Sequence, residues 1–186
     1  MSRHGRILDR ERSILLVIDL QEGYRGKLRH EERIVRSTGR LLTAADRLGI
    51  PVLLTEQYPK GLGATRDDVA SRLPERTECF EKTTFSALGA AGLPDALGRH
   101  ERDQVVLAGI ETHVCISQTA HDLLARGLQV HAVRDAVGAR FRLEDEAGFA
   151  KMVGSGAVPA SSEQVLFEWL ERAGTAEFKA VQRLVV

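Results

Sequence analysis

The sequence predicts an α/β fold in which helices cover both faces of a parallel sheet. Short apolar runs alternate with amphipathic segments along the chain, and glycines follow the segments that should end as helices. Strands that alternate with helices form right-handed βαβ units, which place helices on both faces of the sheet. No internal repeat, low-complexity tract or linker is visible, so residues 1–186 are expected to form a single domain.

The first half of the chain contains two strong strand signals. Ile14–Ile18 is entirely apolar and is predicted to be a buried strand. Glu31–Leu48 has apolar residues at helical spacing, and Gly49 should end that helix. A second strand is expected at Pro51–Thr55, followed by a long polar loop, residues 56–65, over one end of the sheet.

The second half repeats the alternation. Gln104–Ala108 is predicted to be a strand and Thr112–Arg126 a helix that ends at Gly127. Ser161, with Gln164 three residues later, forms a capping-box pattern that should begin another helix. The remaining expected elements are strands at Thr77–Thr83, Leu128–Val133 and Ala157–Ala160, and helices at Pro94–His100, Glu144–Gly154 and Ala176–Leu184.

The composition is typical of a soluble globular protein. Hydrophobic residues make up 43% of the chain and charged residues 28%, and no apolar run approaches the roughly 18 residues of a membrane span. Lysine plus arginine and aspartate plus glutamate both number 26, so no overall basic field predicts nucleic-acid binding. The N-terminus lacks the apolar segment of a signal peptide, and two cysteines make no disulfide framework. A cytoplasmic protein is therefore expected.

Cys115 lies where a buried strand breaks at Gly109 and the chain restarts as a helix. Amide N–H groups in a helix's first turn have no intrahelical partner, and the helix dipole is positive there. Both effects favour the thiolate, which is the nucleophilic form of cysteine. A cysteine that only packed as a small apolar residue would be expected in mid-strand or mid-helix. Cys115 is therefore predicted to be a nucleophile, with the backbone amides of Glu111 and Cys115 as candidate oxyanion donors.

Two charged residues follow strands in the same way. Asp19 closes the first apolar run, and Lys82 stands near the end of the third predicted strand. Burial raises the pKa of a carboxylate toward values useful for a general base, and a buried charge needs a partner. Ligands of open α/β sheets bind outside the carboxyl ends of the strands. We therefore predict that Asp19 takes the proton of Cys115 while Lys82 holds the carboxylate in place.

No pattern for a metal or an organic cofactor is found. The histidines form no HxH, HExxH or DxH spacing, and the cysteines form no CxxC. Gly61-Leu-Gly63 lacks the third glycine of a dinucleotide-binding fingerprint, and Ser117 is not in a G-x-S-x-G elbow. Neither a cofactor nor a metal is expected, and cofactor-free hydrolysis is the simplest chemistry. Cys79 is expected to be a buried, inert thiol.

Three segments resemble the motifs of the isochorismatase-like cysteine hydrolases, and they occur in that family's order. They are Ile18-Asp19-Leu-Gln21, Phe80-Glu-Lys82-Thr-Thr-Phe85-Ser and Gly109-Ile-Glu-Thr-His-Val-Cys115-Ile. The stretch Thr55–Gly63 and the C-terminal segments that begin at Ser162 and Phe178 are similar to the branch called isochorismatase domain-containing proteins. Members of that branch often have no assigned substrate.

The resemblance implies three α/β/α layers around a six-stranded parallel sheet of Rossmann-like order. It implies a catalytic triad of Asp19, Lys82 and Cys115. It further implies a non-proline cis peptide between Ile110 and Glu111, which turns the amides of Glu111 and Cys115 toward an oxyanion. Members of the family commonly form dimers or larger assemblies, so a homo-oligomer is expected.

Three departures from relatives bear on the expected chemistry. Nicotinamidases of this superfamily bind a metal through an Asp-x-His motif after the second strand, where this chain has Glu56-Gln57-Tyr58. Isochorismatases proper lack the nucleophilic cysteine, so the presence of Cys115 favours attack on an acyl carbon over vinyl-ether hydrolysis. His113 also replaces the acidic or amide residue often found two positions before the cysteine.

Together these observations predict a cysteine-dependent hydrolase that cleaves a small amide or related acyl compound through a thioester acyl-enzyme. Two alternatives stay open: a non-catalytic binding or scaffold protein with this fold, and a thiol redox sensor that pairs Cys115 with Cys79. The residues expected to contact the small-molecule substrate, because they lie near the motifs, are Gln21, Gln57, Tyr58 and Phe85.

Overall fold

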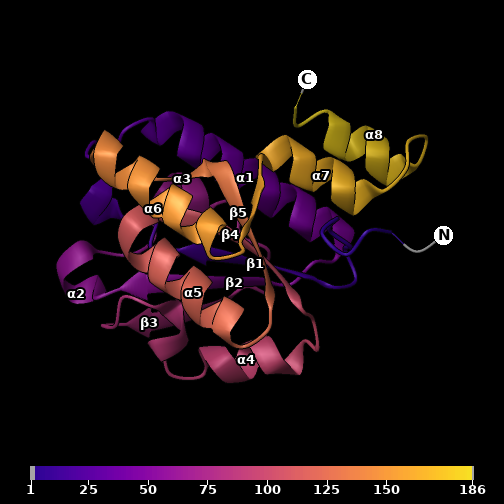
Figure 1. The fold of residues 1–186 in the computed structure, drawn as a ribbon. Helices are drawn as coiled ribbons and strands as arrows, with labels where there is room; N and C mark the ends of the chain where they lie inside the picture. The colour runs from indigo at the N-terminus through magenta and orange to yellow at the C-terminus, as the bar shows by residue number, and fades with distance from the viewer. Residues whose placement is uncertain (1–2, 186) are drawn as a thin grey trace.

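A computed structural model of the chain describes residues 3–185. Six parallel strands form one sheet in the order β3-β2-β1-β4-β5-β6. This order is that of doubly wound, Rossmann-like sheets: the chain adds β2 and β3 on one side of β1 and β4, β5 and β6 on the other, so the strand order switches between β1 and β4. Helices cover both faces and complete three α/β/α layers (Figure 1). The predicted fold class is confirmed.

The strands follow the apolar runs of the sequence. β1 is buried along its whole length because it lies in the middle of the sheet, between two layers of helices. The strands are β1 (Ser13–Ile18), β2 (Val52–Gln57), β3 (Glu78–Lys82), β4 (Gln104–Ile110), β5 (Gln129–Gly138) and β6 (Val158–Ala160).

The helices divide between the two faces. α1, α7 and α8 cover the core that contains Leu41 and Trp169, whereas α4, α5 and α6 cover the core that contains Leu97 and Leu123 (Figure 1). The helices are α1 (Glu31–Leu48), α2 (Pro59–Leu62), α3 (Asp67–Ala70), α4 (Leu93–Arg99), α5 (Ser117–Ala125), α6 (Arg142–Gly154), α7 (Ser162–Leu170) and α8 (Ala176–Gln182), with 3-10 turns at Glu22–Tyr24 and Ala87–Gly89 and a π-helical turn at Thr112–Ile116. No helix among residues 3–185 is long and apolar enough to cross a membrane.

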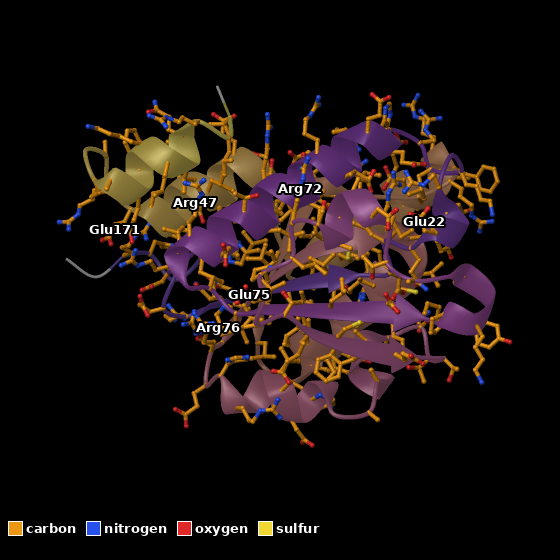
Figure 2. The ribbon with its side chains drawn as sticks, turned by 180° about the vertical axis from the view of Figure 1, so that it is seen from behind. Glu22, Arg47, Arg72, Glu75, Arg76 and Glu171 are labelled. Carbon is orange, nitrogen blue, oxygen red and sulfur yellow. The ribbon has the colours of Figure 1, made fainter. Side chains whose placement is uncertain are left out.

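Local signals placed α1 and the start of α7 correctly. The bounds of α1 are those predicted, and Ser161 and Gln164 form the expected capping box. The short helix α3 was not predicted from the sequence. The chain after it packs on α1 through Arg72 (Figure 2). A Cβ added at Gly39 of α1 would lie 2.0 Å from the Nη1 atom of Arg72.

Two predicted boundaries were wrong at the carboxyl side of the sheet. β5 continues past Val133 to Gly138, because the charge of Asp135 is accommodated by hydrogen bonds from Ser37 and Ser162 rather than marking the end of the strand. Residues 56–65 are not one long loop, since β2 extends to Gln57 and α2 follows.

His131 makes the stability of the fold depend on pH. It is 1% exposed in β5, neither ring nitrogen has a hydrogen-bond partner within residues 3–185, and burial lowers its pKa from 6.5 to about 4. The unfolded chain therefore binds a proton first as the pH falls through 6.5. We expect the free energy of unfolding to drop by about 3 kcal/mol between pH 7 and pH 4 through this residue alone.

Urea denaturation of the wild type and of His131→Leu at pH 7 and pH 4.5 checks this. The Leu variant should lose much less stability on acidification than the wild type. His100→Gln, a change at a more exposed histidine, should keep most of the wild-type pH dependence. Equal losses in the wild type and His131→Leu would contradict the assignment.

Candidate active site

The three predicted catalytic residues come from the carboxyl ends of three strands. Asp19 directly follows β1, Lys82 is the last residue of β3, and Cys115 lies in the π-helical turn after β4. Asp19 is 1% and Lys82 4% exposed, and the Nζ atom of Lys82 lies 2.7 Å from Oδ2 of Asp19. The sheet thus brings two residues 63 positions apart into a buried ion pair.

The Asp19 carboxylate is held by a donor on each oxygen. Lys82 Nζ donates to Oδ2, and the hydroxyl of Thr55 donates to Oδ1 at 2.7 Å. Burial raises the pKa of Asp19, while Lys82, Thr55 and the thiol of Cys115 oppose that rise. The result is an oriented carboxylate that is a stronger base than an exposed one.

The donors of Lys82 are all used inside the protein. In addition to Asp19, its Nζ donates to Oε1 of Gln57 at 2.6 Å and to the carbonyls of Phe85 and Thr84 at 3.2 and 3.3 Å. Its side chain is fully buried. Because an ammonium group has three donors, Lys82 is suited to holding Asp19 and not to binding a ligand directly.

The surroundings of Cys115 differ from the expectation in two ways. The chain forms a π-helical turn at Thr112–Ile116, and α5 begins only at Ser117, so Cys115 is not in the first turn of an α-helix. Burial, and then the negative charge of Asp19, raise the pKa of Cys115 to about 12, although Lys82 opposes them. The expectation of a stabilised thiolate was therefore wrong: the resting group is a thiol that needs a base, and Asp19 interacts with it directly.

The turn that carries Cys115 is anchored on two sides. The hydroxyl of Thr119 donates to the carbonyl of Cys115 at 2.6 Å and accepts from the amide of Ala87 at 2.9 Å. On the other side, the hydroxyl of Thr112 donates to Oδ1 of Asp145 on α6 at 2.6 Å. These contacts hold the turn of Cys115 against Ala87 on one side and α6 on the other.

Gly109 allows β4 to approach β1 just before the site. It has φ +118°, and a Cβ there would lie 2.0 Å from the carbonyl oxygen of Ile18. One residue further on, the peptide bond between Ile110 and Glu111 is cis. The buried side chain of Glu111 accepts two hydrogen bonds on Oε1, from the amide and the Nε of Arg140, at 3.1 and 2.9 Å.

Of the four predicted substrate contacts, two are occupied by the protein itself. Gln21 is fully buried; its Nε2 donates to the carbonyls of Gln57 and Gly63, and its Oε1 accepts from the amide of Gln57. Gln57 binds Lys82 and donates to the carbonyl of Thr83. Tyr58 and Phe85 are exposed at the ends of β2 and β3 and have surface available for a ligand.

Gln21 should therefore matter for stability. We expect Gln21→Ala to lower the free energy of unfolding by about 2–4 kcal/mol, because it removes the partners of three backbone groups. Urea denaturation measures this, with Gln118→Ala, an exposed change on α5, as the matched control. A Gln21→Ala protein as stable as the control would contradict the structural role.

Cys79 is an exposed free thiol on β3, not the buried residue expected from the sequence. β3 lies at the edge of the sheet, which explains the exposure. Burial of part of the side chain and the nearby carboxylates of Glu56 and Glu81 raise the pKa of Cys79 to about 11. Its thiol is therefore poorly ionised at neutral pH.

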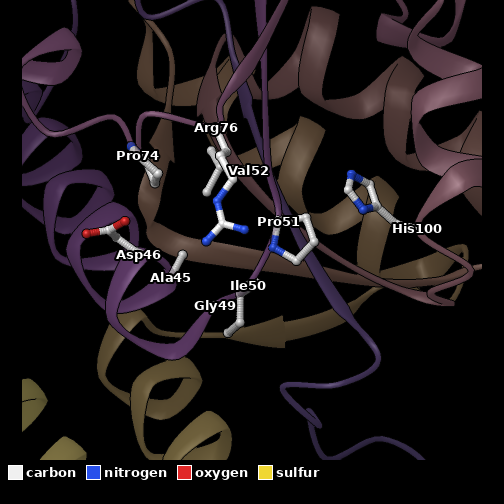
Figure 3. Close-up of a pocket in the computed structure, with 9 residues that line it drawn as sticks. All are labelled: Ala45, Asp46, Gly49, Ile50, Pro51, Val52, Pro74, Arg76 and His100. Atoms are coloured by element: carbon white, nitrogen blue, oxygen red, sulfur yellow. The ribbon is translucent and has the colours of Figure 1, made fainter.

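Two cavities lie at opposite edges of the sheet, and one of them is beside Lys82. A depression of about 400 Å³ beside Lys82 is lined by Tyr58, Thr83 and Gly89. A smaller cavity of about 120 Å³ lies at Pro51 and Val52, the amino end of β2, and therefore at the opposite edge of the sheet from Asp19 (Figure 3). Within residues 3–185, no group of three or more histidine, cysteine or acidic side chains is arranged to hold a metal ion.

Sequence analysis missed three residues of this region: Thr55, Tyr24 and Arg140. Thr55 could have been found, because parallel pairing places it beside Ile18, next to Asp19. Tyr24 ends the short 3-10 turn after β1, and Arg140 lies in the connection after β5; such short segments give no periodic signal. Burial first, and then the carboxylates of Glu111 and Asp19, raise the pKa of Tyr24, and Arg140 lowers it.

The doubly wound sheet, with a buried acid, lysine and cysteine at its carboxyl edge, defines a class of α/β proteins with a candidate hydrolytic site. The chain belongs to the isochorismatase domain family, whose model matches residues 13–164. Isochorismatase domain-containing protein 2A of Mus musculus is 40% identical over 181 residues, which cover 97% of this chain and 85% of that relative. The secreted isochorismatase effector Isc1 of Phytophthora sojae is 35% identical over 191 residues, covering 98% and 88%.

A solved structure is similar to this chain in both fold and sequence. The chain is similar to a structure described as MAR1 ribonuclease from Caenorhabditis elegans, with a TM-score of 0.90 and 38% identity over 96% of this chain and 91% of that one. The family and its fold are thus shown together, and they support hydrolase activity at a coarse level.

Proposed function

We propose that this protein is a cysteine-dependent hydrolase that cleaves a small amide or a related acyl C–N compound through a thioester. The observation that carries the proposal is the buried Asp19–Lys82 ion pair beside the Cys115 thiol. A buried acid that is oriented by two donors and interacts with a neutral thiol is suited to general-base activation of that thiol.

The proposed reaction has two halves. Asp19 takes the proton from Cys115 as Sγ bonds to the acyl carbon, and the backbone amides of Glu111 and Cys115 bind the oxyanion. The C–N bond then breaks, Asp19 gives the proton to the leaving amine, and a thioester remains. In the second half, Asp19 takes a proton from water, the resulting hydroxide attacks the thioester, and the carboxylic acid leaves as Sγ regains its proton. Lys82 keeps Asp19 ionised between these steps.

Acyl-enzyme trapping tests the proposal. The protein is mixed with a panel of small amides and activated esters, quenched in acid and analysed by peptide mass spectrometry. We expect the mass of the acyl group on the Cys115 peptide and none on the Cys79 peptide. A folded protein that forms no adduct with any member of the panel would contradict a thioester mechanism and favour the binding-protein alternative.

Two further experiments test RNA as a substrate and a redox-sensor function. The same panel includes RNA, because the Caenorhabditis elegans relative is described as a ribonuclease; cleavage of RNA lost in Cys115→Ala would redirect the substrate class. A redox sensor would form a Cys79–Cys115 disulfide under peroxide. Cys79→Ser should abolish that disulfide, whereas hydrolysis should survive the same change.

We also propose that the protein acts in the cytoplasm as a homo-oligomer. Two free cysteines fit a reducing compartment, although the Phytophthora sojae relative is described as secreted. Exposed Phe141 and Leu143 offer apolar surface for self-association. The Escherichia coli YcaC structure, which shares the fold at 19% identity, is described as octameric. Light scattering should give a mass of at least twice the 20.5 kDa of one chain, and a mass of one chain would contradict the homo-oligomer.

A further inference from the structure

Arg140 and Tyr24 lie at the candidate site but have no role in the proposed reaction. Arg140 follows β5 and Tyr24 follows β1, and the two segments pack together, since the amide of Arg29 donates to the carbonyl of Ala139 at 3.1 Å. The half-buried Tyr24 is within electrostatic reach of Glu111, Cys115, Asp19 and Arg140. Through its hydrogen bonds to Glu111, Arg140 is joined to the residue that directly precedes the turn carrying Cys115.

The Arg140 guanidinium is fixed along one edge. Its Nε and the residue's own amide both donate to Oε1 of Glu111, whose side chain is 5% exposed. The ring of Phe141 lies 5.6 Å from the guanidinium carbon. The Nη1 and Nη2 atoms form no hydrogen bond or ion pair with residues 3–185, and the side chain is 46% exposed. Arg140 thus has an oriented pair of donors without a protein partner.

We propose that these Nη atoms of Arg140 bind a carboxylate on the substrate, so that the substrate is a small amide that also carries an anionic group. This inference rests on the proposed function and names its substrate class. Two parallel guanidinium donors match the geometry of a carboxylate, and pre-orientation by Glu111 reduces the entropy lost on binding. Lys82 cannot serve, because its side chain is fully buried and its donors are used.

Two alkylating reagents of similar shape and different charge test this without a known substrate. Iodoacetate is anionic and iodoacetamide neutral, and each forms a thioether as Sγ of Cys115 displaces iodide. The rate constants at Cys115 are measured by peptide mass spectrometry in a Cys79→Ser background. Their ratio cancels any change in the pKa of Cys115, because both reagents need the same thiolate.

We expect Arg140→Gln to lower the iodoacetate-to-iodoacetamide ratio by about tenfold or more, as for loss of a charged hydrogen-bonding partner. Arg140→Lys should give an intermediate ratio, because it keeps the charge and loses the paired donors. Arg142→Gln, at an exposed neighbour paired with Glu146, should leave it unchanged.

The alkylation rates distinguish a wrong substrate class from a wrong nucleophile. If both rates fall equally in Arg140→Gln and in Arg140→Lys, Arg140 only positions Glu111 and the anionic substrate class is wrong. An unchanged ratio in both variants overturns the proposal in the same way while leaving the nucleophile intact. If neither reagent modifies Cys115 in the folded parent protein, the nucleophile itself is wrong and both proposals fall.

Discussion

Asp19→Asn should lower kcat/KM for amide hydrolysis by about 10²–10⁴-fold, the usual contribution of a general base. The amide oxygen of asparagine can still accept from Lys82, and the Thr55 hydroxyl can rotate to accept from the amide NH2. Asparagine cannot, however, take the proton of Cys115. Since the charge of Asp19 raises the pKa of Cys115, the same change should lower that pKa. The variant should therefore ionise its thiol more easily and yet turn over more slowly.

Steady-state kinetics on a substrate found by acyl trapping, and titration of the thiolate absorbance with pH, measure the two effects. Thr55→Ser keeps the donor to Asp19 and is the matched control, with kcat/KM close to the wild type. In the wild type, burial raises the pKa of Asp19, so activity should be lost with falling pH above the ordinary aspartate value of 3.8. An Asp19→Asn enzyme within tenfold of the wild type would rule out the general-base role.

The sequence predicts that the helix terminus lowers the pKa of Cys115, whereas in the structure burial and the charge of Asp19 raise it. A helix terminus is a local feature, and it predicts a stabilised thiolate at Cys115. Burial and the carboxylate of Asp19 are tertiary features, and in the structure they dominate and raise the pKa. The sequence therefore identifies Cys115 as the candidate nucleophile from its local position, but not the tertiary contacts that set its pKa. Its activation depends on a residue 96 positions away, from Asp19 to Cys115.

The parts of the fold that could be predicted are those that local pattern determines. Apolar runs and helical spacing located β1, β4 and α1, and strand ends indicated Asp19 and Lys82 at one edge. The π-helical turn could not be predicted, because its apolar pattern continues into α5. Side-chain contacts between distant segments were also out of reach, as in the use of Gln21 to bind the chain beyond β2.

Gly109→Ala should destabilise the protein more than other single-methyl additions, by about 4 kcal/mol or more. The new Cβ would lie 2.0 Å from the carbonyl oxygen of Ile18, and φ is +118°. The clash is with backbone, so no flexible side chain can move aside. Urea denaturation measures the loss. Gly154→Ala, on α6 with no atom within 4 Å of the added Cβ, should cost nothing or stabilise slightly.

Gly109→Ala also tests whether the close approach of β1 and β4 is needed for acyl transfer. Ile18 and Gly109 are paired across β1 and β4, and Asp19 and the turn that carries Cys115 follow them. If Gly109→Ala folds by moving the two strands apart, Asp19 and Cys115 also separate, and acyl transfer should fall with stability. A variant within 1 kcal/mol of the wild type would mean that β1 and β4 can separate at little cost. The close strand approach at Gly109 would then not be what holds the acid beside the thiol.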